Sequence, residues 1–158
     1  MKRYIALAVA VALSVAAIVA AFALQGGTNK ASAAPPQELQ DGRHFGLIKS
    51  VDLQSSPGTL VFDAADLLSG DAANKYAAAR GWEVPVANDS LIANDDPTLR
   101  TLDVSSDAEI LLMDWSRCCE AVPADREQLA AADVTQAWGY WVTLRNGVAV
   151  KIEEQYHP

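Results

Sequence analysis

Two histidines, His44 and His157, are the side chains of this 158-residue chain best suited to moving protons. An imidazole titrates near neutral pH and ligates metals, so two imidazoles brought together by sheet closure could act as an acid–base pair or hold a metal. No H-E-x-x-H or Gly-x-Ser-x-Gly pattern accompanies them. They therefore support an alternative hypothesis, a metal-dependent or hydrolytic enzyme using both histidines and nearby carboxylates. The preferred hypothesis has no catalytic residues.

Oxygen ligands are concentrated in the turn formed by Asn94, Asp95 and Asp96, which Pro97 ends. Carboxylate and amide oxygens are what Ca²⁺ prefers, so these three residues are the candidate metal ligands. The turn lacks the EF-hand pattern, and the same residues suit an Asx-type turn. The preferred interpretation is an ordinary turn, and no cofactor is expected.

Cys118 and Cys119 are adjacent and are the only cysteines in the chain. A disulfide between them would join Cα atoms about 3.8 Å apart, closer than the usual range of roughly 4.4–6.8 Å. Such a bridge would be strained and easily reduced. The functional interpretation is a redox-sensitive loop or a thiol pair that binds a soft metal, and the alternative is a local staple or two thiols of no special role.

Arg100 lies in the apolar run that begins at Leu99 and includes Leu102. Its guanidinium could contact a ligand directly or form an ion pair with an acid at the sheet edge. The ion pair is the preferred interpretation.

The N-terminus has the pattern of an export signal. Lys2 and Arg3 precede an apolar run over residues 5–24, and a small, polar stretch follows and ends in Ala31-Ser32-Ala33. Cleavage after Ala33 is therefore expected. The apolar run is also long enough to span a hydrocarbon core of roughly 30 Å, so an uncleaved membrane anchor is the alternative.

Either fate predicts that the folded part is secreted or lies on the extracytoplasmic face of the cell membrane. Residues 34–42 are expected to form a spacer and residues 43–158 a single globular domain. Removing residues 1–33 takes away three basic residues and no acid, which moves the net charge from -8 to -11. Such a surface repels nucleic acid and anionic lipid heads, so neither is an expected partner.

The elements that must position these residues are short. Alternating apolar residues between turn residues predict strands over 43–53, 59–62, 90–93, 99–104, 109–113, 140–145 and 148–156. A helix is predicted from an N-cap at Ser69 to a stop at Gly81, and another over 125–132. This set predicts a mainly β (α+β) domain, either a small antiparallel curled sheet or a partly open OB-like barrel with one or two short helices.

The clearest element is the last hairpin, because Asn146-Gly147 favours a two-residue type I′ turn. In a regular hairpin with this turn, Trp141 faces Ile152 and Thr143 faces Val150. This register predicts a buried face made of Trp141, Val150 and Ile152. It predicts that two charged residues point outward, Lys151 and Glu153.

Several segments resemble an uncharacterised family of small secreted or lipid-anchored proteins of Gram-positive bacteria. The similar segments cover residues 46–52, 67–72, 88–94, 99–102, 141–148 and 154–156. The chain departs from the family at Ser90 and Leu91, where an aromatic residue is expected, and it lacks the lipid-acceptor cysteine of some relatives. The resemblance implies a shared fold and an export route, and it implies no reaction.

The leading functional hypothesis is therefore an extracytoplasmic, non-enzymatic domain that binds a protein partner or a cell-envelope component.

Overall fold

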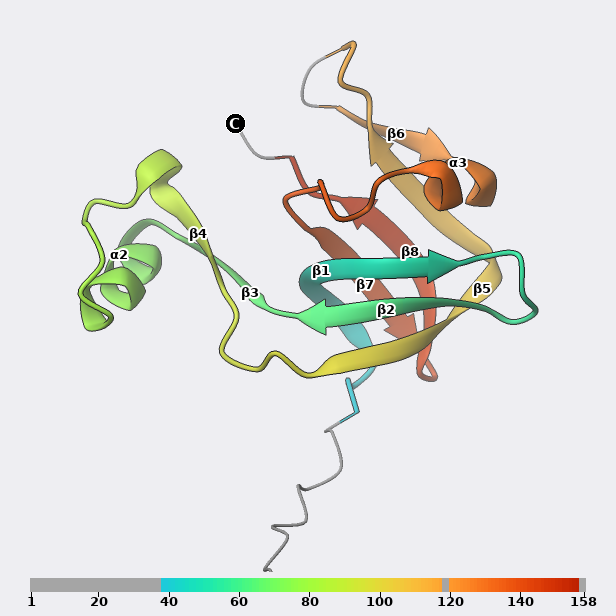
Figure 1. Ribbon diagram of the computed structural model, residues 1–158, viewed down its shortest axis with the longest axis horizontal. Helices are drawn as coiled ribbons and strands as arrows, with labels where there is room; N and C mark the ends of the chain where they lie inside the picture. Colours follow the sequence, from blue (N-terminus) through green and yellow to red (C-terminus); the bar gives the residue numbers. More distant parts are fainter. Residues whose placement is uncertain (1–37, 118–119, 157–158) are drawn as a thin grey trace, which may run out of the picture. The chain divides into compact units, whose positions relative to one another are not determined.

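Apolar side chains alternate along five strands, and these strands close into a barrel around them (Figure 1). The computed structural model describes residues 38–117 and 120–156. The barrel strands are β1 (Gly42–Asp52), β2 (Gly58–Ala64), β5 (Leu99–Met113), β7 (Tyr140–Arg145) and β8 (Val148–Glu154). Their order is β2-β1-β7-β8-β5, and β5 also pairs with β2 and so completes the barrel.

The barrel is of OB-like type, which confirms the predicted fold class. Helix α3 (Arg126–Ala131) lies in the chain between the third and fourth barrel strands. Two details differ from the prediction. The barrel is closed rather than partly open, and β5 and β8 run parallel whereas the other barrel pairings are antiparallel.

The core fills the barrel with large apolar side chains, which include Ile48, Leu60, Phe62, Val142 and Ile152. Helix α3 adds Leu129 to the core, and this side chain is fully buried. The helix starts at a capping box, in which the side chains of Asp125 and Gln128 each accept a hydrogen bond from the other's backbone N–H.

An arm, residues 66–93, is inserted between β2 and β5. Its strands β3 (Asp66–Ser69) and β4 (Ser90–Ala93) form a two-stranded antiparallel sheet, and helix α2 (Gly70–Ala79) and the short 3₁₀ helix η1 (Ala87–Asp89) connect them. Figure 1 shows the arm, in green, leading away from the barrel strands. Helix α2 follows Ser69 and ends before Gly81, whose φ of +69° suits a helix stop.

Strand β5 corrects the prediction of two strands over 99–104 and 109–113. It is one strand of 15 residues, and its pairing with β8 is irregular between Val104 and Glu109. Ser105-Ser106-Asp107 favour a turn, but they lie in this irregular stretch, between residues of β5 that pair up to Val104 and again from Glu109. Strand β6 (Ala121–Ala124) pairs with the end of β5, and neither β6 nor β3 was predicted.

The last hairpin has the predicted turn but not the predicted register. A bulge at Val150 separates the pair Leu144–Ala149 from the pair Thr143–Lys151. One extra residue reverses which side chains face the core. Val142 and Leu144 are therefore buried in the barrel, Ile152 is buried opposite Val142, and Trp141 lies on the outside, so the buried face predicted for Trp141 and Val150 is wrong.

Within the described ranges, no helix is both long enough and apolar enough to cross a membrane. The predicted export signal over residues 1–33, the cysteine pair Cys118 and Cys119, and His157 lie outside the described residues.

Candidate binding groove

A groove of about 410 Å³ brings together residues from distant parts of the chain. It is lined by β1, by the root of the arm, by the turn after β4, by the start of β5 and by β7. We call this site the groove and define it by its polar and aromatic lining: Arg43, His44, Phe45, Asp66, Asp95, Asp96, Arg100 and Trp141. Four residues singled out in the sequence therefore line one site, namely His44, Asp95, Asp96 and Arg100.

One wall of the groove is aromatic. Phe45 on β1 and Trp141 on β7 are cross-strand partners, and their ring centroids lie 5.2 Å apart in an edge-to-face arrangement. The guanidinium of Arg43 lies 4.0 Å from the centroid of the Trp141 ring and also pairs with Glu153 at 3.2 Å. The indole N–H of Trp141 donates to Gln155 Oε1 at 2.7 Å. These contacts hold the side chains of the aromatic wall in place.

The acidic turn forms the opposite side through an ion pair. Arg100 donates from Nη2 to Asp96 Oδ2 at 2.7 Å and from Nη1 to the carbonyl of Thr98 at 2.8 Å. The hydroxyl of Thr98, and then Arg100, hold the pKa of Asp96 below its ordinary value. The Arg100 side chain is 10% exposed, so it stands in the groove wall with its charge already paired.

The neighbouring carboxylate connects the turn to the arm. Asp95 accepts hydrogen bonds from the hydroxyl of Tyr76 at 2.8 Å and from Arg80 at 2.6 Å, and these contacts lower its pKa. Arg80 also lies over the ring of Tyr76, 3.4 Å from its centroid. Helix α2 is thus held against the turn by an aromatic ring and an ion pair.

The three candidate metal ligands do not converge. Asp95 and Asp96 bind different arginines, and Oδ1 of Asn94 is buried without a hydrogen-bond partner among the described residues. No group of three or more His, Cys, Asp and Glu side chains in the described part of the chain could hold a metal ion. The turn has the Asx geometry that its sequence favours, since Asp96 accepts from the backbone N–H of Thr98.

His44 is held by the segment that precedes β1. Its Nε2 lies 2.7 Å from the backbone carbonyl of Gln40, and because a carbonyl oxygen accepts, Nε2 carries the proton in this arrangement. The other member of the proposed catalytic pair, His157, lies outside the described residues, so the enzymatic hypothesis stays a prediction.

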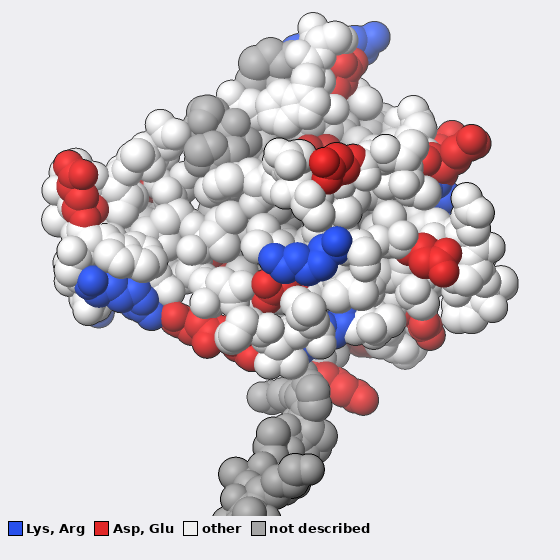
Figure 2. All heavy atoms as spheres, viewed as in Figure 1, with Lys and Arg blue, Asp and Glu red and all other residues white. Residues whose placement is uncertain are grey.

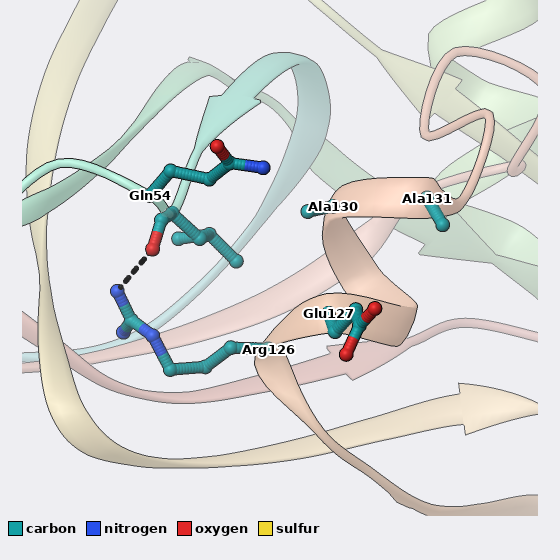
Figure 3. Close-up of a pocket in the computed structure, with 6 residues that line it drawn as sticks. Gln54, Arg126, Glu127, Ala130 and Ala131 are labelled. Atoms are coloured by element: carbon teal, nitrogen blue, oxygen red, sulfur yellow. Dashed lines mark hydrogen bonds between the residues drawn. The ribbon is translucent and has the colours of Figure 1, made fainter.

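Arg126, which lies outside the groove, has a structural role. The guanidinium donates to the backbone carbonyls of Ser105 at 2.8 Å and Leu53 at 3.1 Å. Figure 3 shows it extending from α3 to the loop after β1, beside a hollow of about 500 Å³. A Cβ at Gly58 would collide with this guanidinium. Arg126 therefore holds the β1–β2 loop against β5 and α3.

The charges on the surface are mixed. On the face shown in Figure 2, acidic and basic side chains are interspersed, and that face has no large patch of one sign. The ion pair Lys151–Glu109 joins the neighbouring strands β8 and β5, and Arg43–Glu153 joins β1 and β8 across β7.

Comparisons with models of known protein families, with curated proteins and with solved structures found no match for this chain. The resemblance to an uncharacterised secreted family therefore stays a prediction. The aromatic wall was missed in the sequence because Trp141 was placed in the core. Two tryptophans three residues apart, Trp138 and Trp141, beside the basic start of β1 were the available signal.

Proposed function

We propose that this domain works outside the cytoplasmic membrane as a non-enzymatic binding module, and that the groove holds its ligand. The observation that carries the proposal is the convergence of an aromatic wall, two arginines and an acidic turn where the arm joins the barrel. Small-molecule and polymer sites in proteins commonly lie at such junctions and combine apolar walls with a few fixed polar groups.

The state of the ionisable groups supports binding rather than chemistry. Arg100 and Arg43 are each paired with a carboxylate, and His44 is bonded to the backbone of Gln40. A catalytic acid or base needs a proton-transfer atom directed at the substrate. In the groove, both guanidinium groups bind carboxylates and His44 Nε2 binds a backbone carbonyl, which suits a rigid recognition surface.

The expected ligand is an envelope polymer that presents both apolar faces and hydrogen-bonding groups. The Trp141 ring and the neighbouring alanines can contact apolar faces, and the exposed carboxylate of Asp66, which forms no ion pair with a described residue, can accept hydrogen bonds. A protein partner is the second possible ligand. Nucleic acid is not expected, because the exported chain would carry a net charge of -11.

The test is a pull-down from an intact envelope fraction with the purified exported protein as bait. Retained material would be divided between protein and polymer by protease digestion. We expect Trp141→Ala and Asp66→Asn to reduce the retained material at least about 10-fold. Trp82→Ala and Glu83→Gln serve as matched controls, since both residues lie on the arm outside the groove. Equal retention by all four variants would contradict a ligand in the groove.

The proposed location has a separate test. If Ala31-Ser32-Ala33 directs cleavage, intact mass of the secreted protein should show a chain that begins at Ala34. Recovery of full-length protein in the membrane fraction alone would support the uncleaved anchor.

A further inference from the structure

A second pocket, of about 370 Å³, lies at the other end of β7 and β8 from their turn. It is bounded by the end of β5, by the segment after α3 and by the first and last residues of the β7–β8 pair. Its polar and aromatic lining consists of Trp115, Asp133, Gln136, Tyr140 and Glu154, and Leu112 and Ala137 are among its apolar lining residues. We call it the acidic pocket.

Tyr140 gives the first sign that this pocket takes a ligand. Its side chain is 2% exposed and lines the pocket, and its hydroxyl has no hydrogen-bond partner among the described residues. The hydroxyl is not among the fully buried atoms that lack a partner, so it opens to the pocket, where a ligand can bond to it. Burial, with the carboxylates of Glu154 and Asp133 nearby, raises the pKa of the phenol, so the hydroxyl stays neutral.

The two carboxylates of the pocket give the second sign. Oε2 of Glu154 accepts from the backbone N–H of Met113 at 2.9 Å. Oδ1 of Asp133 accepts from the backbone N–H and the hydroxyl of Thr135 at 3.2 and 2.6 Å. One oxygen of each carboxylate is left without a described donor, and neither carboxylate forms an ion pair with a described residue.

The register of β7 and β8 brings Tyr140 and Glu154 together. The bulge at Val150 places Glu154 opposite Tyr140, whereas a regular hairpin would have placed Glu153 there. Glu153 instead lies opposite Trp141 and pairs with Arg43 at the groove.

We propose that the acidic pocket binds a primary alkylammonium group. Such a group has three N–H donors, and the pocket offers three matching acceptors, the free oxygens of Asp133 and Glu154 and the hydroxyl of Tyr140. The exposed ring of Trp115 adds a face that attracts cations, and Leu112 and Ala137 suit the methylene chain that carries the amine. This site is separate from the groove and does not depend on the function proposed for it.

The amine could belong to a free diamine or to a lysine side chain of a larger molecule. We would titrate the exported protein with 1,5-diaminopentane and with Nα-acetyl-lysine amide. Binding would be measured by titration calorimetry and by the change in tryptophan fluorescence. Binding of the diamine alone would indicate a free amine, and binding of both would indicate a lysine-type side chain. The control probes are 1-pentanol, which has no charge, and tetramethylammonium, which has no N–H.

We expect the control probes to bind at least about 10-fold more weakly than the amines. Tetramethylammonium binding as tightly as the amines would overturn the hydrogen-bonding proposal in favour of a cation held by the ring alone. Ca²⁺ that displaces the amines at lower concentration would identify a metal site instead.

Three variants test the residues. Glu154→Gln keeps an oxygen for the Met113 N–H and removes the charge, so we expect about a 10-fold loss of amine affinity. Tyr140→Phe should lose about 5-fold, in line with one hydrogen bond. Asp133→Asn, on an exposed residue, gives a variant whose folding is not at risk, and Glu83→Gln on the arm is the control for net charge. Unchanged affinity in the three pocket variants, or an equal loss in the control, would refute the proposal.

Discussion

The groove and the acidic pocket both contain carboxylates, but two of those in the groove, Asp95 and Asp96, are neutralised by arginines, whereas neither carboxylate of the acidic pocket pairs with an arginine of the described chain. Asp95 pairs with Arg80 at 2.6 Å, and Asp96 pairs with Arg100 at 2.7 Å. In the acidic pocket, Glu154 is bonded to a backbone N–H and Asp133 to the residue two positions later.

Two consecutive residues of β8 show the same contrast. Glu153 faces outward and pairs with Arg43, beside the groove. Glu154 faces the acidic pocket and has no described cationic partner. Asp95 and Asp96 hold the turn against the arm and the barrel, whereas the carboxylates of the acidic pocket contribute little to the fold and are available to a ligand. Changes to the two sets should therefore differ in stability and in binding.

The largest effect is expected where the two regions share a support. Ile152 precedes both glutamates, is fully buried and lies opposite Val142 in the core. We predict that Ile152→Ala lowers the free energy of unfolding by about 2–5 kcal/mol, as truncations of buried side chains do. Urea unfolding at neutral pH measures the change. A loss below about 1 kcal/mol would show that the barrel register differs from the one described.

The next effect should be confined to the groove. Arg100→Met removes the guanidinium that joins Asp96 to the Thr98 carbonyl, and we predict a loss of about 1–3 kcal/mol in unfolding free energy. The control is Arg145→Met, since Arg145 is exposed at the end of β7 and forms no ion pair with a described residue. An equal effect of the two substitutions would show that the Asp96 pair does not organise the turn.

The sequence predicted those parts of the fold that depend on local chemistry. Helix α2 lies between the predicted N-cap Ser69 and the predicted stop Gly81, and the last hairpin turns at Asn146-Gly147 as its residues require. In each case the signal is a backbone preference of residues that are neighbours in the chain.

The parts of the fold that the sequence did not predict depend on pairing between residues that are distant in the chain. Nothing local at Val150 indicates a bulge, yet that one extra residue moves Trp141 outside the barrel and places Glu154 opposite Tyr140. Ser105-Ser106-Asp107 favours a turn, but the chain before and after it pairs with distant strands and continues as a single strand β5. Both candidate sites are made of such distant residues, so single residues such as Arg100 could be picked out from the sequence, but neither the groove nor the acidic pocket was predicted.

The pH dependence of stability should reveal the contribution of Asp96 in the groove. Thr98 and Arg100 hold the pKa of Asp96 below its ordinary value of 3.8. A lowered carboxyl pKa stabilises the fold above the unfolded value, and this contribution is lost as the pH falls through 3.8 and then through the lower folded value. We predict that Asp96→Asn is destabilising at pH 7 and that its difference from the parent chain shrinks below pH 3.8. Urea unfolding at a series of pH values tests this, and a constant difference would contradict it.

The smallest effect is predicted for Tyr140→Phe without a ligand. The substitution keeps the buried ring and removes a hydroxyl that has no hydrogen-bond partner among the described residues. Removing a hydroxyl that opens to the pocket and lacks a protein partner should change the unfolding free energy by less than about 0.5 kcal/mol, or raise it slightly.

Unfolding the same variant with 1,5-diaminopentane present measures what the hydroxyl contributes to ligand binding. A ligand that binds only the folded state raises the unfolding free energy by RT ln(1 + [L]/Kd), where [L] is the free ligand concentration. The parent chain should therefore gain more stability from the amine than Tyr140→Phe does, although the two chains are equally stable without it. A loss above about 1 kcal/mol in the absence of amine would show that the hydroxyl has a structural partner, and the acidic pocket would then be a part of the core rather than a site for a ligand.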